Sequence, residues 1–343
     1  MTNPHAAKID AQHDRDLAAV ERIAAERRGQ RRYLHPAPAA ERTVPEPLRT
    51  VDIAELLTLD IPAREVFLAP WLTAQSLSMI WAWRGTGKTL AALAVAYAVA
   101  SGGSAFGWQA PKPRRVLYLD GELPCSELQA RAAALVAVED QQPAPGMLRF
   151  LTPDLQPRGM PNLATAAGQL ALQPLVADAD LIVVDSIATL GRGGRENEAE
   201  GWQPVAAWAL DQRAAGRAVL FVHHAGKGGQ QRGTSSREDI LDVVLSLKRP
   251  SDYHEREGAR FEVRFEKARA LKGADVEPFE ARLETGPDDR RIWTCKPADI
   301  GRNDRILELG GLGMSVREIA EELGVSKSSV HRALQHQQEA AHE

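Results

Sequence analysis

Apolar, strand-like segments alternate with alanine-rich, helical segments between residues 51 and 298. The strand-like segments are LSMIW, RVLYLDGE, LIVVDS and AVLFVHH, and the first three precede TLAALAVAYAVA, SELQARAAALVAV and QPVAAWALDQRAAG. This alternation is typical of an α/β fold, in which helices connect the strands of a parallel sheet. Four further segments, DVVLSLKRP, ARFEVRFEKARAL, PFEARLE and RRIWTCKP, are separated by short turns. We expect them to be antiparallel additions at one end of the sheet.

The two ends of the chain have different patterns. Residues 1–50 are rich in Ala, Arg, Glu and Pro, which predicts a partly helical arm with a flexible linker. Residues 299–343 contain only helical signals, among them a capping box of Ser315 with Glu318 and a second cap at Ser326. We therefore predict three parts: an arm (1–50), an α/β core (51–298) and a small all-α module (299–343).

Composition narrows the class of protein. The 343 residues have a formal net charge of -4, so any affinity for nucleic acid must come from local basic groups. Cys125 and Cys295 are too few for a disulfide framework and lack metal-type spacing. The sequence has no long apolar run and no signal-like start, so we expect a cytoplasmic protein without a membrane partner.

The segment AWRGTGKTL, between the strand-like LSMIW and the first helical segment, fits a phosphate-binding loop. Glycines let backbone N–H groups face a phosphate, a lysine reaches the β- and γ-phosphates, and a Thr hydroxyl ligates Mg²⁺. Ala82 stands where the motif has its first glycine, but a small residue there preserves most of the room. The predicted ligands are ATP and Mg²⁺, and the predicted contacts are Arg84, Gly85, Thr86, Gly87, Lys88, Thr89 and Leu90.

Three acidic residues follow predicted parallel strands. Asp185 ends LIVVDS and is a candidate for supporting Mg²⁺ together with Thr89. Glu122 and Asp120 follow RVLYL, and ligands in such sheets bind at the carboxyl edge. Glu122 is the candidate general base, Asp120 is the lesser rival, and an ordinary solvated acidic turn is the alternative.

The order of these motifs resembles the RecA-type P-loop ATPases, in particular the RepA-like hexameric plasmid replicative helicases and their phage and mobile-element relatives. The resemblance covers residues 65–298 and depends most on YLDGE, VVDS, FVHHAGK and RGTSS. It implies that Lys88 and Glu122 are catalytic and that His224 senses the γ-phosphate, with His223 as its structural neighbour. It also implies assembly of identical subunits, with six in a ring, and action on single-stranded DNA.

Several basic residues are candidates for contacts in trans or with DNA. The polar loop GKGGQQRGTSSRED contains Lys227 and Arg232. It would line a central channel, supply Arg232 as an arginine finger to a neighbouring subunit, or be a mobile surface loop. Lys267 and Arg269 form a second trans candidate, because related ring helicases place a basic pair there. The loop after Asp185 offers Arg192 and Arg195 as candidates for phosphate contacts, although Glu196, Glu198 and Glu200 dilute the positive charge there.

The C-terminal segment resembles the helix-turn-helix of resolvases, invertases and many regulators. Its second helix would present Lys327, Ser328, Ser329, His331 and Arg332 to the major groove of duplex DNA. Six glutamates surround this helix, so the affinity of a single copy for DNA should be weak. The alternative is a protein-interaction module. The chain as a whole is interpreted as an ATP-hydrolysing replicative helicase. The alternatives are an ATP-switched DNA-binding regulator or recombination accessory factor and a nucleotide-gated scaffold.

Overall fold

The computed structural model describes residues 49–193, 199–225, 238–250, 252–286, 290–298 and 302–340. The chain divides into two compact units, residues 1–62 and residues 63–343. The described part of the first unit contains α2 (Ile53–Thr58), which begins where Asp52 Oδ1 accepts a 2.8 Å hydrogen bond from the Glu55 amide. Most of the predicted arm lies outside the described residues.

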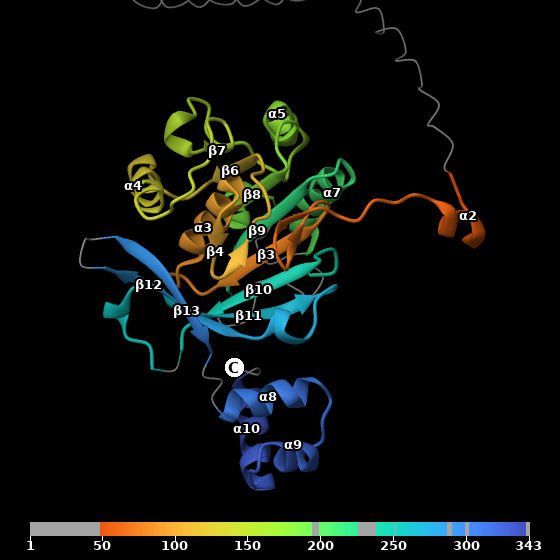
Figure 1. The fold of residues 1–343 in the computed structure, drawn as a ribbon, viewed down its shortest axis with the longest axis vertical. Helices are drawn as coiled ribbons and strands as arrows, with labels where there is room; N and C mark the ends of the chain where they lie inside the picture. The colour runs from red at the N-terminus through yellow and green to blue at the C-terminus, as the bar shows by residue number, and fades with distance from the viewer. Residues whose placement is uncertain are drawn as a thin grey trace, which may run out of the picture. The chain divides into compact units, whose positions relative to one another are not determined.

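Among the described residues of the second unit, nine strands form one mixed sheet (Figure 1). In order across the sheet they are β7 (Leu148–Leu151), β6 (Val116–Asp120), β8 (Leu181–Asp185), β9 (Ala218–His224), β3 (Leu77–Ala82), β10 (Val243–Lys248), β11 (Arg260–Ala268), β12 (Phe279–Thr285) and β13 (Arg291–Pro297). The strands from β7 to β10 are parallel, and β11 to β13 continue antiparallel. The α/β fold with antiparallel additions is confirmed.

The direction of β10 differs from the prediction. This strand covers DVVLSLKRP and pairs parallel with β3, with Val243 opposite Ser78 and Leu247 opposite Ala82. Parallel neighbours usually need a helical crossover, and the segment GKGGQQRGTSSRED before β10 has no helical pattern, so the sequence favoured an antiparallel strand. The strand that carries the glycine-rich loop therefore has parallel neighbours, β9 and β10, on both sides.

Helices pack on both faces of the sheet because its parallel strands are apolar on both faces. One face packs against α3 (Lys88–Ser101) and α4 (Cys125–Val136). The other packs against α5 (Ala166–Val176), the short α6 (Ile187–Leu190) and α7 (Ala199–Ala214). Strand β3 serves both faces: Ile80 belongs to the α3 side and Met79 to the α7 side.

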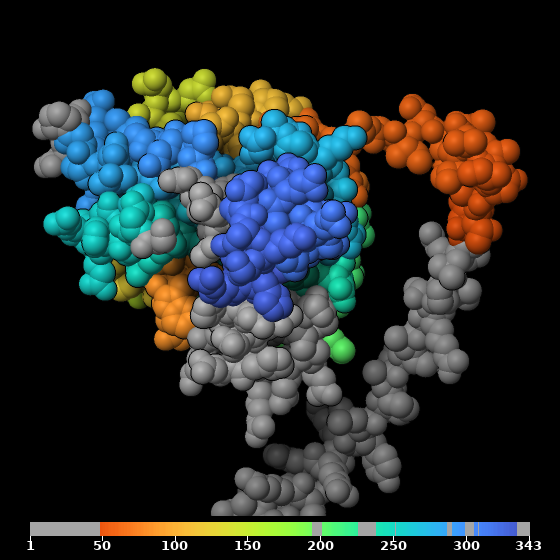
Figure 2. All heavy atoms as spheres, turned by 90° about the horizontal axis from the view of Figure 1, so that it is seen from below, coloured from red at the N-terminus to blue at the C-terminus, as the bar shows by residue number. Residues whose placement is uncertain are grey.

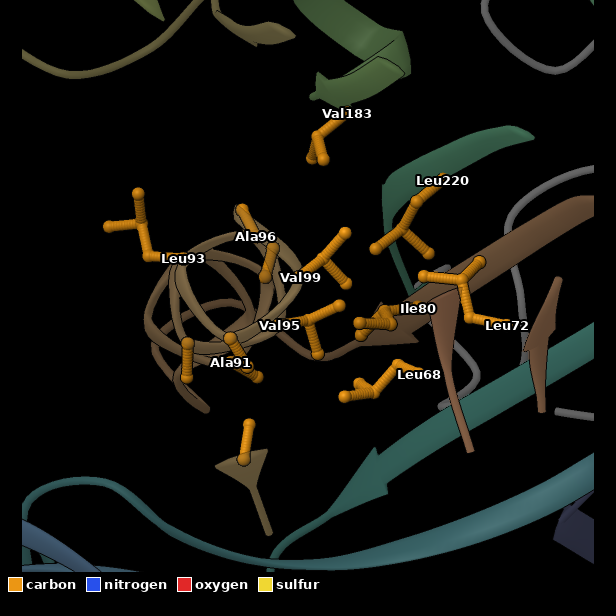
Figure 3. Packing of buried hydrophobic residues seen from close by; sticks show 14 of the residues in the cluster. Leu68, Leu72, Ile80, Ala91, Leu93, Val95, Ala96, Val99, Val183 and Leu220 are labelled. Atoms are coloured by element: carbon orange, nitrogen blue, oxygen red, sulfur yellow. The ribbon is translucent and has the colours of Figure 1, made fainter. Parts of the chain in front are cut away.

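Helix α3 is buried on nearly all sides. Figure 3 shows Val95 and Val99 pointing toward Leu68, Ile80 and Leu220. The many alanines of this helix let it lie close to the strands, and a helix that is apolar all round belongs in a core. This packing fixes the helix N-terminus, and hence the glycine-rich loop, against the sheet.

Small elements extend this framework. Two hairpins pair β1 (Val66–Leu68) with β2 (Leu72–Thr73) and β4 (Ser104–Ala105) with β5 (Trp108–Gln109). Trp108 joins both hairpins to the antiparallel strands, since its ring lies 5.4 Å from that of Trp71 and 5.5 Å from that of Phe279. The described single-turn 3₁₀ helices are η1 (Pro153–Leu155), η3 (Glu255–Glu257) and η4 (Gly273–Val276).

The C-terminal helices α8 (Arg302–Gly311), α9 (Val316–Glu322) and α10 (Lys327–Ala340) form a compact cluster with its own core (Figures 1 and 2). That core consists of Ile306, Leu309, Ile319, Ala320 and Val330. The predicted caps are confirmed: Ser315 and Glu318 form a reciprocal capping box, and Ser326 Oγ accepts from the Ser329 amide at 3.2 Å. Gly324 makes the turn at φ +59°. In the described part of the chain, no helix is long and apolar enough to cross a membrane.

Candidate active site

Four parallel strands end at one edge of the sheet, where the candidate residues gather. Asp120 ends β6 and is the register partner of Asp185, which ends β8. Ala82 ends β3 and is opposite His224, which ends β9. The order β6, β8, β9, β3 therefore places the acidic turns, the histidine and the glycine-rich loop side by side.

The glycine-rich loop has the backbone that a phosphate requires. Gly85 and Gly87 lie at φ +74° and +117°, conformations that favour glycine. A Cβ on Gly87 would lie only 3.1 Å from Phe261 Cε1. No side chain caps α3 at Gly87, so the N–H groups of its first turn suit an anion. Ala82 is the buried last residue of β3, so glycine is not needed there.

The Lys88 side chain folds back onto the glycine-rich loop, where a phosphate would bind. The side chain is 6% exposed, and Nζ donates a 3.1 Å hydrogen bond to the carbonyl oxygen of Trp83. Burial lowers the pKa of Lys88, while the charges of Asp185 and Glu122 oppose this. The buried Thr86 Oγ1 finds no hydrogen-bond partner among the described residues. A phosphate oxygen would supply partners for both side chains.

Thr89 and Asp185 form a second group behind the loop. The Thr89 side chain hydrogen-bonds Asp185, and Tyr118 Oη donates to Asp185 Oδ2 at 2.7 Å. Burial raises the pKa of the Asp185 carboxyl to about 6, although both hydrogen bonds act in the opposite direction. A hydroxyl and a carboxylate are the hard oxygen ligands that Mg²⁺ prefers. These two residues therefore fit the predicted metal role.

Glu122 lies at the centre of a hydrogen-bonded trio. Its Oε1 accepts a hydrogen bond from Ser186 Oγ and lies 3.0 Å from His224 Nε2. The hydrogen bond from His224, reinforced by that from Ser186, lowers the pKa of Glu122 to about 2. The carboxyl group is therefore ionised at neutral pH. The predicted base and the predicted sensor thus lie in direct contact.

Asp120 and His223, the alternatives to Glu122 and His224, are both fully buried. Asp120 Oδ1 accepts hydrogen bonds from the Glu122 and Leu123 amides at 3.0 and 3.2 Å. It shapes the turn that presents Glu122. His223 is also fully buried, so its role is that of a core residue.

The other basic candidates of the core lie apart from this trio. Lys267 Nζ donates to the Glu238 carbonyl oxygen, and Arg269 Nη2 donates to the Asp239 carbonyl oxygen at 2.5 Å. Both thus contact the last two residues of the segment GKGGQQRGTSSRED. Exposed Arg192 donates to the carbonyl oxygen of Met160 at 3.1 Å. Outside the described residues lie Arg195, Lys227 and Arg232.

The remaining loop candidates border open surface. Arg84 is exposed, and Leu90 lines a cavity of about 30 Å³ with Arg131, Leu283 and Trp293.

In the C-terminal cluster, four candidates are exposed on α10: Lys327, Ser328, His331 and Arg332. The Ser328 hydroxyl is 2.9 Å from that of Ser326, so it takes part in the helix cap.

Sequence reasoning missed three supporting residues. Tyr118 and Ser186 contact the candidate acids from positions 67 and 64 residues away along the chain. Arg249, after β10, donates to the Gly85 carbonyl oxygen at 3.2 Å and lies 4.4 Å over the Tyr253 ring. The only signal for Ser186 was its place directly after Asp185, and nothing in the local patterns marked the others.

The fold and this site together define a P-loop ATPase with a RecA-like core and a C-terminal helix-turn-helix. Residues 41–230 match the AAA domain family (AAA_25), which is more than half of the chain, and the chain belongs to this family. Residues 305–337 match the IclR helix-turn-helix domain.

Comparisons with individual proteins are more distant. No match was found among curated proteins. Among solved structures, the flagellar accessory protein FlaH from Methanocaldococcus jannaschii is similar at 14% identity and a TM-score of 0.42, over 64% of this chain and 90% of that one. A KaiC-like protein from Pyrococcus horikoshii OT3 is similar at 16% identity and a TM-score of 0.45, over 67% and 94%.

Proposed function

We propose that this protein is an ATP-hydrolysing, DNA-acting oligomeric motor, and that its particular role is that of a mobile-element replicative helicase. The observation that carries the proposal is the grouping of Lys88, Asp185 and Glu122 at one sheet edge, with Glu122 ionised beside His224. An ionised carboxylate in this place suits a general base that takes a proton from the water attacking the γ-phosphate.

ATP and Mg²⁺ would be held by different parts of the site. The N–H groups of the loop and Lys88 would bind the β- and γ-phosphates, and Lys88 would exchange its bond to Trp83 for phosphate oxygens. Thr89 would ligate Mg²⁺, supported by Asp185, and the ion would neutralise charge that develops on the phosphates. Tyr118 fixes Asp185 from the buried side.

DNA would be contacted at two places. The exposed cations of α10 favour duplex DNA as the partner of the C-terminal helices. Single-stranded DNA would contact the loop that begins after His224, as the family resemblance implies. A ring, with six subunits as the proposed number, would let Arg232 or the pair Lys267 and Arg269 complete a neighbouring site. An arginine finger is worth a factor of about 10³ to 10⁵ in turnover.

A second candidate function is an ATP-switched DNA-binding regulator without unwinding activity. The observation in its favour is the glutamate-rich surface of the helix-turn-helix, where Glu318, Glu321 and Glu322 lie on α9. These negative charges lower the affinity of a single helix-turn-helix for DNA. Several copies on an ATP-dependent assembly would therefore be needed for firm DNA binding.

Steady-state ATP turnover without DNA, with single-stranded DNA and with duplex DNA tests the proposal. We expect strong stimulation by single strands that weakens as salt rises, because phosphate contacts release counterions. The control is Lys88→Ala, which removes the phosphate contact and is expected to abolish turnover. Measurable turnover that ignores single strands would favour the regulator, and no turnover in the wild type would contradict both.

A further inference from the structure

Glu122 uses only one of its carboxylate oxygens in the hydrogen-bonded trio. Both Ser186 Oγ and His224 Nε2 reach Oε1. The side chain is 31% exposed, so it also has an open side. Two donors on one oxygen hold the carboxylate in place, and neither of them engages Oε2.

Ser186 is held firmly enough to act as such a donor. It is fully buried at the end of β8, directly after Asp185. Its amide donates to Thr189 Oγ1 at 3.3 Å, and Thr189 Oγ1 donates back to its carbonyl oxygen at 3.0 Å. The Thr189 amide donates to the Ser186 carbonyl oxygen at 3.2 Å, at the start of α6. These bonds fix the backbone of Ser186, and the single proton of its hydroxyl is donated to Glu122.

The turn that carries Glu122 is packed against the same short helix. The Gly121 amide donates to the Asp185 carbonyl oxygen at 2.7 Å. A Cβ on Gly121 would lie only 2.4 Å from Thr189 Oγ1, so a glycine is needed for this close approach. The ends of β6 and β8 are therefore joined beside the Ser186 hydroxyl.

We propose that Ser186 is a positioning residue for the general base, which holds Oε1 of Glu122 so that Oε2 takes the proton of the attacking water. This inference rests on the proposed ATPase function. Water attacks the γ-phosphorus, the bond to the β-phosphate oxygen breaks to release ADP, and the water proton passes to Glu122. Ser186 itself touches neither water nor nucleotide in this step.

Ser186→Ala removes the donor and tests the proposal in full-length protein. We expect kcat to fall by a factor of about 10 to 100, which is what one charge-assisted hydrogen bond is worth, while KM for ATP changes less than about twofold. Ser186→Thr keeps the hydroxyl and is expected to restore most of the rate. Ser246→Ala is the matched control, because it removes another buried serine hydroxyl that donates to a carboxylate, that of Glu266, outside the trio.

A double-mutant cycle separates positioning from general damage. In a Glu122→Gln background, Ser186→Ala is expected to change single-turnover hydrolysis less than about twofold, because the base it positions is gone. Equal losses in both backgrounds, equal losses in Ser246→Ala, or a wild-type rate in Ser186→Ala would overturn the proposal. If Ser186→Ala does not fold, Ser186→Gly replaces it, since glycine costs only about a few tenths of a kcal/mol as an N-cap.

Wild-type turnover distinguishes the proposed function from the role of Ser186. If wild-type protein does not hydrolyse ATP, the proposed function is wrong. If the wild type hydrolyses ATP, Glu122→Gln does not, and Ser186→Ala is unaffected, then only the role of Ser186 is wrong.

Discussion

Two buried tyrosines provide a matched comparison at the scale of single residues. Tyr118 Oη donates to the buried Asp185, whereas Tyr97 Oη has no partner among the described residues. Tyr118→Phe removes a donor and leaves a buried carboxylate oxygen with one partner fewer. We expect a loss of about 1 to 3 kcal/mol in the free energy of unfolding, measured in urea without nucleotide. Tyr97→Phe, which removes no described hydrogen bond, is the control and is expected to change it by less than about 0.5 kcal/mol.

The sequence predicted the candidate site where a local motif carries the chemistry. Lys88 and Thr89 were predicted from the loop motif and Asp185 from its place at the end of an apolar strand, and Glu122 was preferred to Asp120 after another strand. The structure supplies a reason for that preference, because Asp120 is occupied by two backbone amides. Ser186 could not be assigned in this way, since its contact with Glu122 exists only after β6 and β8 become neighbours.

At the scale of elements, one buried ion pair joins two antiparallel strands. Arg260 of β11 donates from Nε and Nη2 to the Glu280 carboxylate of β12 at 2.9 and 3.0 Å. Both side chains are less than a tenth exposed, and Arg260 also contacts Glu257. Asp252 also pairs with Arg260, at 3.0 Å, but only Glu280 joins Arg260 to the next strand, so this pair holds the additions to the sheet in register.

Glu280→Gln tests this pair and its pH dependence. We expect a loss of about 2 kcal/mol in the free energy of unfolding at pH 7, as for hydrogen bonds to a charged group, because Glu257 and Asp252 still pair with Arg260. The hydrogen bond from Arg260 lowers the pKa of Glu280, so the carboxylate stabilises the fold above its ordinary pKa near 4.5. That contribution is lost as the pH falls through the lower folded-state pKa, and the difference between the proteins should shrink.

Urea unfolding at pH 7, 5, 4 and 3 measures both effects. Glu284→Gln is the matched control, because its ion pair with Arg282 is 3.7 Å long and largely exposed. Its expected loss is below about 1 kcal/mol. A difference for Glu280→Gln that stays constant down to pH 3 would contradict the assignment.

Most elements followed from the hydrophobic pattern, because their apolar runs are long and their period is clear. Strand β7 did not, since its four residues are half-buried and include Arg149. The predicted direction of β10 was wrong, because a strand's direction depends on the path of the connection before it. No local sequence pattern records that path. A mixed sheet therefore needs tertiary information at the point where its parallel and antiparallel parts meet.

At the scale of the whole molecule, we expect the helix-turn-helix and the ATPase core to be separable in function. Changing both Lys327 and Arg332 to Ala removes two exposed cations of α10. Duplex affinity should fall, and the slope of log affinity against log salt should become shallower by about 1 for each DNA phosphate that is no longer neutralised. Single-strand-stimulated turnover should stay within about twofold of the wild type.

The control for this variant is Lys112→Ala, which removes an exposed cation of the core that pairs with Glu65. Fluorescence anisotropy with labelled duplex at several salt concentrations gives affinity and slope together. An unchanged slope in the double variant would mean that α10 does not contact phosphates. In that case the helical cluster would be better regarded as a protein-interaction module.

The distribution of aromatic residues has an optical consequence. The seven tryptophans all lie between residues 71 and 293, and residues 299–343 contain no Trp, Tyr or Phe. Intrinsic fluorescence therefore reports on the ATPase core and is silent about the C-terminal helices. Within the core, Trp83 belongs to the phosphate-binding loop itself and is 47% exposed, whereas five other indoles are buried. The loop thus carries its own emission probe, and iodide reaches that indole more readily than the buried ones.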